Sequence, residues 1–495
     1  MINQISTFEK LWKFRVYIRV GAIILSAILL VLGFALNLGK LTLPAVMIVW
    51  GINIIWCLES LKDRFIFFFF QITMYIFLIG RPVIQYFKGE QWFFYGKAEL
   101  FFCMVSLWST LVSMYLGAII AERYIIAGSC STSCIRIEQQ RDIIKYLQVV
   151  SLMVFLLAFI IELVAGLERI RFSMNHSYEE YYVSFKTHIP YLLRVLEAFL
   201  PYGLCIFLST NPKKKVAFSV LTLYVLSAIP NFIVGTRNPV ILNLLFALTY
   251  YLIRDNMGDD KKWFGKIEKI LVFVGTPVLT IIMFTYAYIR AGLKIPHIGL
   301  NVINGFIYQQ GTTFNVLSLG YDSLSLLPAG KCYTLGGLID YYMHGSLAQH
   351  LFGATDLGSG NSVIMGTVSN SFAHNMSYIM HPEYLNGQGW GSCYILEVFA
   401  DFGYLGVVIY SILIGILMMS IIKLCKTHYI FYTMSLVVLM QLFFTPRSSA
   451  LGFLNPIFEM PFIVCLVGCI AGAYILKFLK RKWDMLRSEN GKYKN

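Results

Sequence analysis

Twelve apolar stretches recur along this chain, and each is close to the roughly 20 residues that a helix needs to cross a bilayer. Backbone N–H and C=O groups find no water in the hydrocarbon core, so these stretches favour helices, which pair those groups internally. The stretches are 19–38, 41–58, 65–85, 99–120, 146–166, 190–209, 216–234, 239–253, 269–289, 395–420, 428–445 and 456–476. We therefore predict an all-α polytopic integral membrane protein of about 12 transmembrane helices, with residues 1–495 forming a single transmembrane domain.

The distribution of positive charge predicts how the chain is oriented. With a cytoplasmic N-terminus, the cytoplasmic links carry more than twice as many Lys and Arg residues as the outer links. That asymmetry is typical of an inserted membrane protein, and an even number of spans then places both termini in the cytoplasm. The first stretch follows several basic residues and precedes no small-residue cleavage site, which indicates a retained helix. The net charge of +14 favours anionic membrane lipid, and no basic, aromatic-rich surface suits nucleic acid.

One link is far longer than the others. Residues 291–391 separate the ninth and tenth stretches, and the predicted topology makes them one large extracytoplasmic loop. Long inserts of this kind are usually functional or disordered, and the aromatic content of this one argues against disorder. Within it, 335-LGGLIDYYMHGSLAQHLFG-353 predicts a short helix or helix pair on the membrane surface.

Arginines mark the outer ends of several stretches. Arg237 and Arg447 each lie in a short turn between two stretches, and Arg290 ends the ninth stretch. An arginine beside a helix N-terminus favours a bound anion, because the free backbone N–H groups add to its charge. Anchoring at lipid headgroups is the alternative, and we favour it for Arg81. Inside the sixth stretch, Arg194 and Glu197 are expected to pair with each other or to line a cavity.

Two carboxylates occur where the chain enters the tenth stretch. Glu397 and Asp401 lie four residues apart in 386-NGQGWGSCYILEVFADFGYLG-406, a spacing that places them on one face of a helix. Acids in the first turn also stabilise a helix through its dipole, here with Ser392 as the cap. The sequence therefore leaves two interpretations open: a stabilised helix entrance, or the anionic side of a site.

Histidines gather in the long loop. Five of the eight in the chain lie within 291–391, among them His344, His350 and His374. Histidine exchanges a proton near neutral pH and so suits a general base, although simple exposure in a polar loop is the alternative.

These groups together suit a phosphate-bearing lipid. Guanidinium groups bind phosphate oxygens through paired N–H donors and can replace a divalent cation. The outer links contain no HExxH, no DxD and no paired CxxC. We therefore expect no metal and no cofactor, with fixed cations stabilising a leaving diphosphate at headgroup depth.

The same stretch carries a family resemblance. With the dozen spans and the outer loop before the last helices, GQGWGSCYILEVFADFGYLG resembles the Wzy-type polymerases of bacterial surface polysaccharides. Those proteins often show a glycine-rich approach, then Ser-Tyr, a Glu, and Phe-Gly-x-x-Gly. The matching residues here are Gly389, Gly391, Ser392, Tyr394, Glu397, Phe402, Gly403 and Gly406. Cys393 interrupts the Ser-Tyr pair, and the GTRNP turn at Arg237 is similar to a Gly-x-Arg turn in many members.

The resemblance implies a metal-independent membrane glycosyltransferase of the bacterial cytoplasmic (inner) membrane. Such an enzyme polymerises polyprenyl-diphosphate-linked oligosaccharide repeat units of O-antigen, capsule or exopolysaccharide on the outer face. The diphosphate would be bound by Arg237, Arg447 and Arg290. The catalytic candidates are Glu397, Asp401, His344, His350 and His374.

The resemblance also implies partners and leaves rivals. A chain-length regulator and a flippase of the same pathway would work beside the polymerase. An O-antigen ligase-type glycan transferase is the alternative within the same chemistry, and a lipid-linked oligosaccharide flippase or transporter is the alternative outside it. A transporter favours two related halves with charges near the middle of the spans. A single large outer loop fits that pattern poorly.

Overall fold

The helices of this protein follow the apolar stretches of the sequence. The structure, a computed structural model, describes residues 2–90, 96–126, 137–176, 180–181, 184–258, 262–290, 301–358 and 360–492. All regular elements in these ranges are helical. The bundle consists of α1 (Ile2–Ala35), α2 (Thr42–Glu59), α3 (Leu61–Met74), α4 (Gly80–Phe87), α5 (Lys97–Ile120), α6 (Ile137–Ser173), α8 (Tyr191–Glu197), α9 (Leu200–Ser209), α10 (Lys214–Ser227), α11 (Ile229–Val234), α12 (Asn238–Met257), α13 (Lys266–Arg290), α20 (Tyr394–Cys425), α21 (Tyr429–Leu442), α22 (Asn455–Phe458) and α23 (Met460–Lys492).

The predicted fold class is confirmed. In the described ranges, ten helices or joined helix pairs are long and apolar enough to cross a membrane, so the chain is an all-α polytopic membrane protein. Of the other two predicted stretches, 239–253 lies within α12 and 428–445 contains the shorter α21. The total of about 12 spans and their orientation stay predictions.

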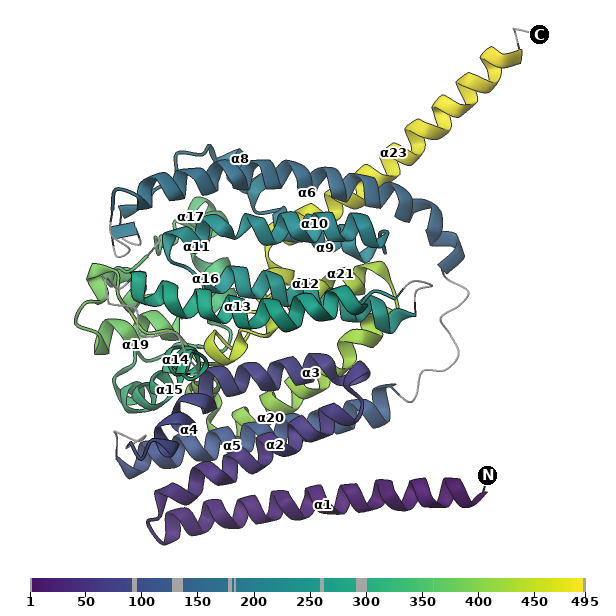
Figure 1. The fold of residues 1–495 in the computed structure, drawn as a ribbon. Helices are drawn as coiled ribbons and strands as arrows, with labels where there is room; N and C mark the ends of the chain where they lie inside the picture. The colour runs from purple at the N-terminus through teal and green to yellow at the C-terminus, as the bar shows by residue number, and fades with distance from the viewer. Residues whose placement is uncertain are drawn as a thin grey trace.

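Short helices gather at one end of the bundle and form what we call the cap. They are α14 (Asn301–Gln310), α15 (Thr312–Ser323), α16 (Gly336–His344), α17 (Ser346–Phe352), α18 (Val363–Thr367) and α19 (Phe372–Met380). Figure 1 shows them on the left, while both chain termini lie on the opposite side of the bundle. The cap comes from the predicted loop 291–391, of which 291–300 and 359 lie outside the described residues. Its helix pair α16–α17 matches the pair predicted for 335–353.

Close backbone contacts fix α20 against α5. A Cβ atom on Gly117 would lie 2.1 Å from the carbonyl oxygen of Ile412, and one on Gly415 would lie 2.3 Å from that of Met114. Small residues allow membrane helices to approach this closely. The contact sets the position of α20, which carries the two predicted acids at its start.

A break at Gly403 divides α20 into two parts. The φ of 61° and ψ of −160° at this residue fall in a region that is essentially restricted to glycine. We therefore expect Gly403→Ala to lower the free energy of unfolding by about 1–3 kcal/mol, measured by thermal unfolding of the purified protein. Gly468→Ala is the matched control, since a Cβ there meets no atom within 4 Å. An unchanged melting temperature for Gly403→Ala would show that the break is unstrained.

Candidate functional site at the capped end

Glu397 lies in the first part of α20 and is only 2% exposed. Its Oε1 accepts a hydrogen bond from Ser392 Oγ at 2.5 Å, and its Oε2 accepts one from the backbone N–H of Ala450 at 2.7 Å. Tyr410, beyond the break, donates its hydroxyl to the carbonyl oxygen of the same Ala450. The prediction that Ser392 caps the helix is wrong, because its hydroxyl is turned to Glu397 and Cys393 holds the cap position. Both parts of α20 thus hold the turn that contains Ala450.

Arg447 lies in the same connection, between α21 and α22. Residues Thr445–Arg447 form a single 3₁₀ turn, η6, shortly before Ala450. Arg447 Nη1 donates to the backbone oxygen of Gln310 at 3.1 Å and lies 3.2 Å from its side-chain Oε1. Gln310 is 4% exposed and ends α14. Arg447 therefore joins the connection after α21 to the cap.

A second arginine reaches the same end of α14. The guanidinium carbon of Arg81 lies 4.2 Å from the centre of the Tyr308 ring, and its Nη2 is 3.3 Å from the Tyr308 hydroxyl. A Cβ on the neighbouring Gly311 would lie 2.5 Å from Arg81 Cβ. Arg81 Nε is buried without a hydrogen-bond partner among the described residues. The headgroup interpretation of Arg81 stays a prediction, and its guanidinium group also lies on the face of an aromatic ring of the cap.

Arg237 contacts α13, a helix that packs on α14. It precedes α12, and its Nη1 donates to the carbonyl oxygen of Met283 on α13 at 3.0 Å. The next residue on α13, Phe284, packs so closely on Gly305 of α14 that a Cβ there would lie 2.4 Å from the ring. Arg290, the third predicted diphosphate ligand, ends α13, and its side chain lies outside the described part of the structure.

The structure therefore brings Arg81 and Arg447, from distant parts of the chain, to one short helix, and it brings Arg237 to the neighbouring α13. Arg81 and Arg447 contact the C-terminal end of α14, and Arg237 binds α13 where that helix packs on α14. Cations held in place by protein contacts stabilise charge on a departing group without having to reorganise. Chemically, the arrangement suits an anion with several oxygens.

Asp401 binds the backbone of the cap. Its Oδ1 accepts the N–H of Tyr333 at 3.0 Å and its Oδ2 accepts the N–H of Thr334 at 2.6 Å, just before α16. Both carboxylate oxygens thus hold the chain that leads into the cap helices. Glu397 and Asp401 therefore bind different parts of the chain. Glu397 binds the turn at Ala450, and Asp401 binds the cap.

We expect Asp401→Asn to loosen the cap. An amide would present its own N–H to one of the two backbone donors, and an unpaired donor costs about 1–3 kcal/mol. Limited tryptic cleavage after Lys331 should become faster than in the wild type. Glu383→Gln, a change at an exposed cap acid whose side-chain partner is Asn386, is the control and should digest normally. Wild-type digestion of Asp401→Asn would contradict the anchoring role.

The first two predicted histidines are each held by a carbonyl group of the cap. His344 Nδ1 lies 3.0 Å from the Thr355 oxygen, and His350 Nδ1 lies 2.6 Å from the Ser346 oxygen. A carbonyl oxygen only accepts, so Nδ1 of a neutral ring carries the proton and Nε2 holds the lone pair. Both rings therefore have the tautomer that a general base acting through Nε2 requires.

His374 is the more enclosed of the predicted histidines. Its Nδ1 lies 2.9 Å from the Tyr384 hydroxyl, and burial lowers its pKa from the ordinary 6.5 while Asp340 opposes that shift. The unfolded chain therefore binds a proton as pH falls through about 6.5, before the folded chain does. Stability should consequently fall as the pH falls from neutral toward the folded pKa.

The corresponding experiment compares melting temperatures between about pH 7 and pH 5. We expect the loss of stability on acidification to be smaller in His374→Gln than in the wild type. His350→Gln changes an exposed ring and should keep the wild-type slope. If the melting temperatures of the wild type and His374→Gln fell equally with pH, His374 would not contribute to the loss of stability in acid.

A second charged cluster lies between α6, α8 and α11. Arg169 Nη2 donates to Glu162 at 2.9 Å and to Glu197 at 3.1 Å, and its Nη1 donates to Asn231 Oδ1 at 2.7 Å. The predicted pairing of Glu197 with Arg194 is wrong, because Glu197 turns to α6 and Arg194 is exposed. The cluster fixes α6 against α11, the helix that leads into the Arg237 turn.

No group of three or more His, Cys, Asp or Glu side chains in the described ranges could hold a metal ion. The long apolar helices and the folded cap make this chain a polytopic α-helical membrane protein.

The family model described as O-antigen polysaccharide polymerase Wzy matches residues 18–482, nearly the whole chain, and the protein belongs to this family. It is therefore a polymerase of O-antigen repeat units, and its family acts on lipid-linked oligosaccharides in the bacterial inner membrane. No curated protein and no solved structure matches the chain significantly.

Proposed function

We propose that this polymerase transfers the growing glycan from its polyprenyl diphosphate carrier to the next lipid-linked repeat unit, on the outer face of the membrane. A hydroxyl group of the acceptor sugar attacks the anomeric carbon of the donor sugar. The bond from that carbon to the diphosphate oxygen breaks, and the polyprenyl diphosphate leaves with the bonding electrons. A base takes the proton of the hydroxyl group. Repeat units of O-antigen, capsule or exopolysaccharide suit this reaction equally.

The observation that carries the proposal is the convergence of arginines on α14. We assign the leaving diphosphate to Arg447, Arg81 and Arg237, with Arg290 as a further ligand. Arg447 and Arg81 both contact residues 308–311, and Arg237 is held on α13, which packs on the same helix. Fixed guanidinium groups can neutralise a diphosphate as a divalent cation does, so the proposed reaction needs no metal and no cofactor. Polymerisation should continue in a chelator such as EDTA.

Glu397 and Asp401 position the chain in this reaction and do not transfer a proton. Both oxygens of Glu397 and both of Asp401 accept hydrogen bonds from protein donors, which supports positioning rather than proton transfer. The base is then a cap histidine, and His344, His350 and His374 are the candidates. Single replacements by alanine identify it, because loss of the base removes the acidic limb of the pH–rate profile.

The proposal also fixes an orientation. The cap faces outward and both termini face the cytoplasm, and the partners are a flippase and a chain-length regulator of the same pathway. A topology reporter inserted at residue 345 should read the outer side. A cytoplasmic reading would contradict the proposed site of transfer.

The lipid-linked glycans of a deletion strain test the function itself. We expect carriers bearing one repeat unit to accumulate on the outer leaflet while long lipid-linked chains disappear. Loss of a ligase-type transferase would instead leave long chains on the carrier. Loss of a flippase would leave single units on the inner leaflet. Either of these two outcomes would contradict the proposed polymerase.

A further inference from the structure

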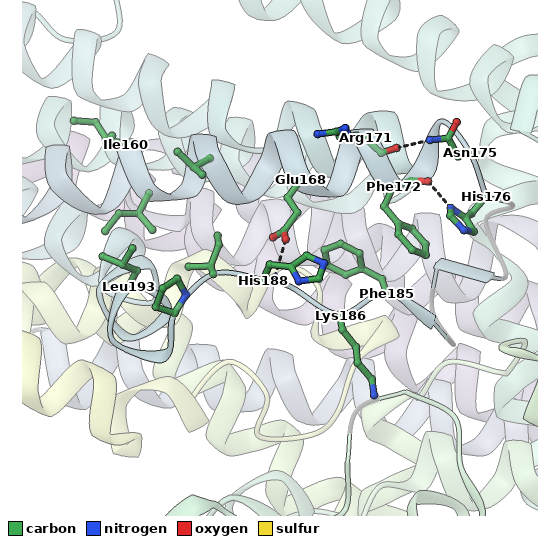
Figure 2. Close-up of a pocket in the computed structure, with 14 residues that line it drawn as sticks. Ile160, Glu168, Arg171, Phe172, Asn175, His176, Phe185, Lys186, His188 and Leu193 are labelled. Atoms are coloured by element: carbon green, nitrogen blue, oxygen red, sulfur yellow. Dashed lines mark hydrogen bonds between the residues drawn. The ribbon is translucent and has the colours of Figure 1, made fainter.

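An open groove of about 700 Å³ lies between α6 and the segment 185–193 that leads into α8. Figure 2 shows its two sides, with Ile160 and Leu193 toward one end and His176 and Lys186 toward the other. Its volume is within the range of ligand pockets, roughly 300–1,000 Å³. The groove is separate from the arginines around α14.

One end of the groove is apolar and open to the surroundings of the bundle. Ile160 is 59% exposed and Val164 is 56% exposed, both on the candidate span that contains α6. From residue 160 to the end of α6 at residue 173 the helix rises about 20 Å, against roughly 15 Å for the hydrocarbon of one leaflet. The groove is therefore long enough to hold a hydrocarbon chain from the interior of a leaflet to the headgroup level.

The wall opposite α6 is held in place without a ligand. Glu168 accepts hydrogen bonds from Thr187 Oγ1 at 2.6 Å and from the backbone N–H of His188 at 2.7 Å, as Figure 2 shows for His188. The ring of Phe172 packs edge-on against Phe185, with 5.3 Å between ring centres. The groove is thus a built feature of the fold rather than a loose gap.

The polar end of the groove is positive. Two cations line it, Arg171 and Lys186, together with the imidazole rings of His176 and His188, and all four side chains are exposed. The acid that lines it, Glu168, has both oxygens engaged in holding the wall. An apolar trough that ends in cations complements a molecule with a hydrocarbon tail and an anionic head.

The opposite face of α6 connects the groove to the Arg237 turn. Arg169, the residue after Glu168, donates to Asn231 on α11, and α11 ends at Val234, just before Arg237. A lipid head at the end of the groove would therefore lie on the helix that supports one of the proposed diphosphate ligands. The proposed reaction joins two lipid-linked molecules, so it needs a second lipid site beside the first.

We propose that this groove binds the polyprenyl diphosphate of the acceptor repeat unit, with the isoprenoid chain along Ile160 and Val164 and the phosphates at Arg171 and Lys186. This inference rests on the proposed function, because only a reaction between two lipid-linked units requires two such sites.

Counting bound lipid tests the groove directly. Native mass spectrometry of the detergent-solubilised protein with polyprenyl diphosphate should show two bound molecules in the wild type and one in Val164→Trp, whose ring fills the groove. Leu167→Trp is the matched control, because Leu167 is 67% exposed on the same helix but does not line the groove. Lys186→Glu should also lose one molecule, and Lys40→Glu, a change at another exposed lysine, should bind two.

Kinetics distinguish this inference from the proposed function. Val164→Trp should raise the KM for lipid-linked repeat unit by about tenfold or more with little change in kcat. Two bound molecules in Val164→Trp, or an unchanged KM, would overturn the groove assignment while leaving the polymerase intact. If Val164→Trp lost bound phosphatidylglycerol rather than polyprenyl diphosphate, the groove assignment would also be overturned. If the wild type bound two molecules but formed no polymer, the proposed function would fail, and the groove would remain a polyprenyl diphosphate site without an acceptor role.

Discussion

Arg447→Ala is expected to lower the rate of chain extension by about 100-fold or more. Removing one preorganised donor from a developing anion typically costs a factor of about 10²–10³ in rate, and Arg447 also holds the end of α14 through Gln310. The measurement is the extension rate of the purified protein on lipid-linked repeat units. Arg447→Lys should recover only part of the rate, because lysine keeps the charge and loses the paired donors.

Two further variants separate this effect from general damage. Arg15→Ala removes an exposed arginine on α1 whose ion pair with Glu59 is 3.6 Å long, and it should extend chains normally. Arg81→Ala should act on the same step as Arg447→Ala, so the double variant should lose less than the product of the two single losses. A wild-type rate for Arg447→Ala at normal protein levels would exclude Arg447 from the diphosphate site.

Glu397→Ala should lower the free energy of unfolding by about 3 kcal/mol. The change leaves the buried N–H of Ala450 without its acceptor and removes the partner of Ser392, and a buried polar group left unsatisfied costs about 1–3 kcal/mol. Since Arg447 lies three residues before Ala450 in the same connection, chain extension should fall with stability. Thermal unfolding and extension rates, measured on the same preparation, check both effects.

Glu397→Gln distinguishes positioning from base catalysis. The amide oxygen can still accept from Ala450, and the amide nitrogen can donate to the hydroxyl oxygen of Ser392. We therefore expect Glu397→Gln to keep most of the stability and the activity. A stable but inactive Glu397→Gln would contradict the positioning role and restore Glu397 as the base.

The helical framework and its charged landmarks could be predicted from the sequence because they depend on local patterns. Apolar length located all the long helices, and a spacing of four residues placed Glu397 and Asp401 on one helix. The partners of these acids were not predictable, since Ala450 and Thr334 lie 53 and 67 residues away along the chain.

Two contacts escaped prediction for the same physical reason. Arg81 has the sequence features of a headgroup anchor, yet its partner Tyr308 lies 227 residues away. Arg194 and Glu197 are one helical turn apart, but packing brings Arg169 of α6 to Glu197. Short spacing on one helix predicts a pair only where no neighbouring helix supplies a better-placed charge.

The central claim is that this protein alone links lipid-borne repeat units and releases the lipid diphosphate. The most direct measurement uses the purified protein in liposomes that contain lipid-linked repeat units, with EDTA present. We predict a ladder of lipid-linked chains, with one polyprenyl diphosphate released for each new linkage, and little product with Arg447→Ala. A wild-type protein that leaves single units unextended, or extends them without releasing polyprenyl diphosphate, would contradict the claim.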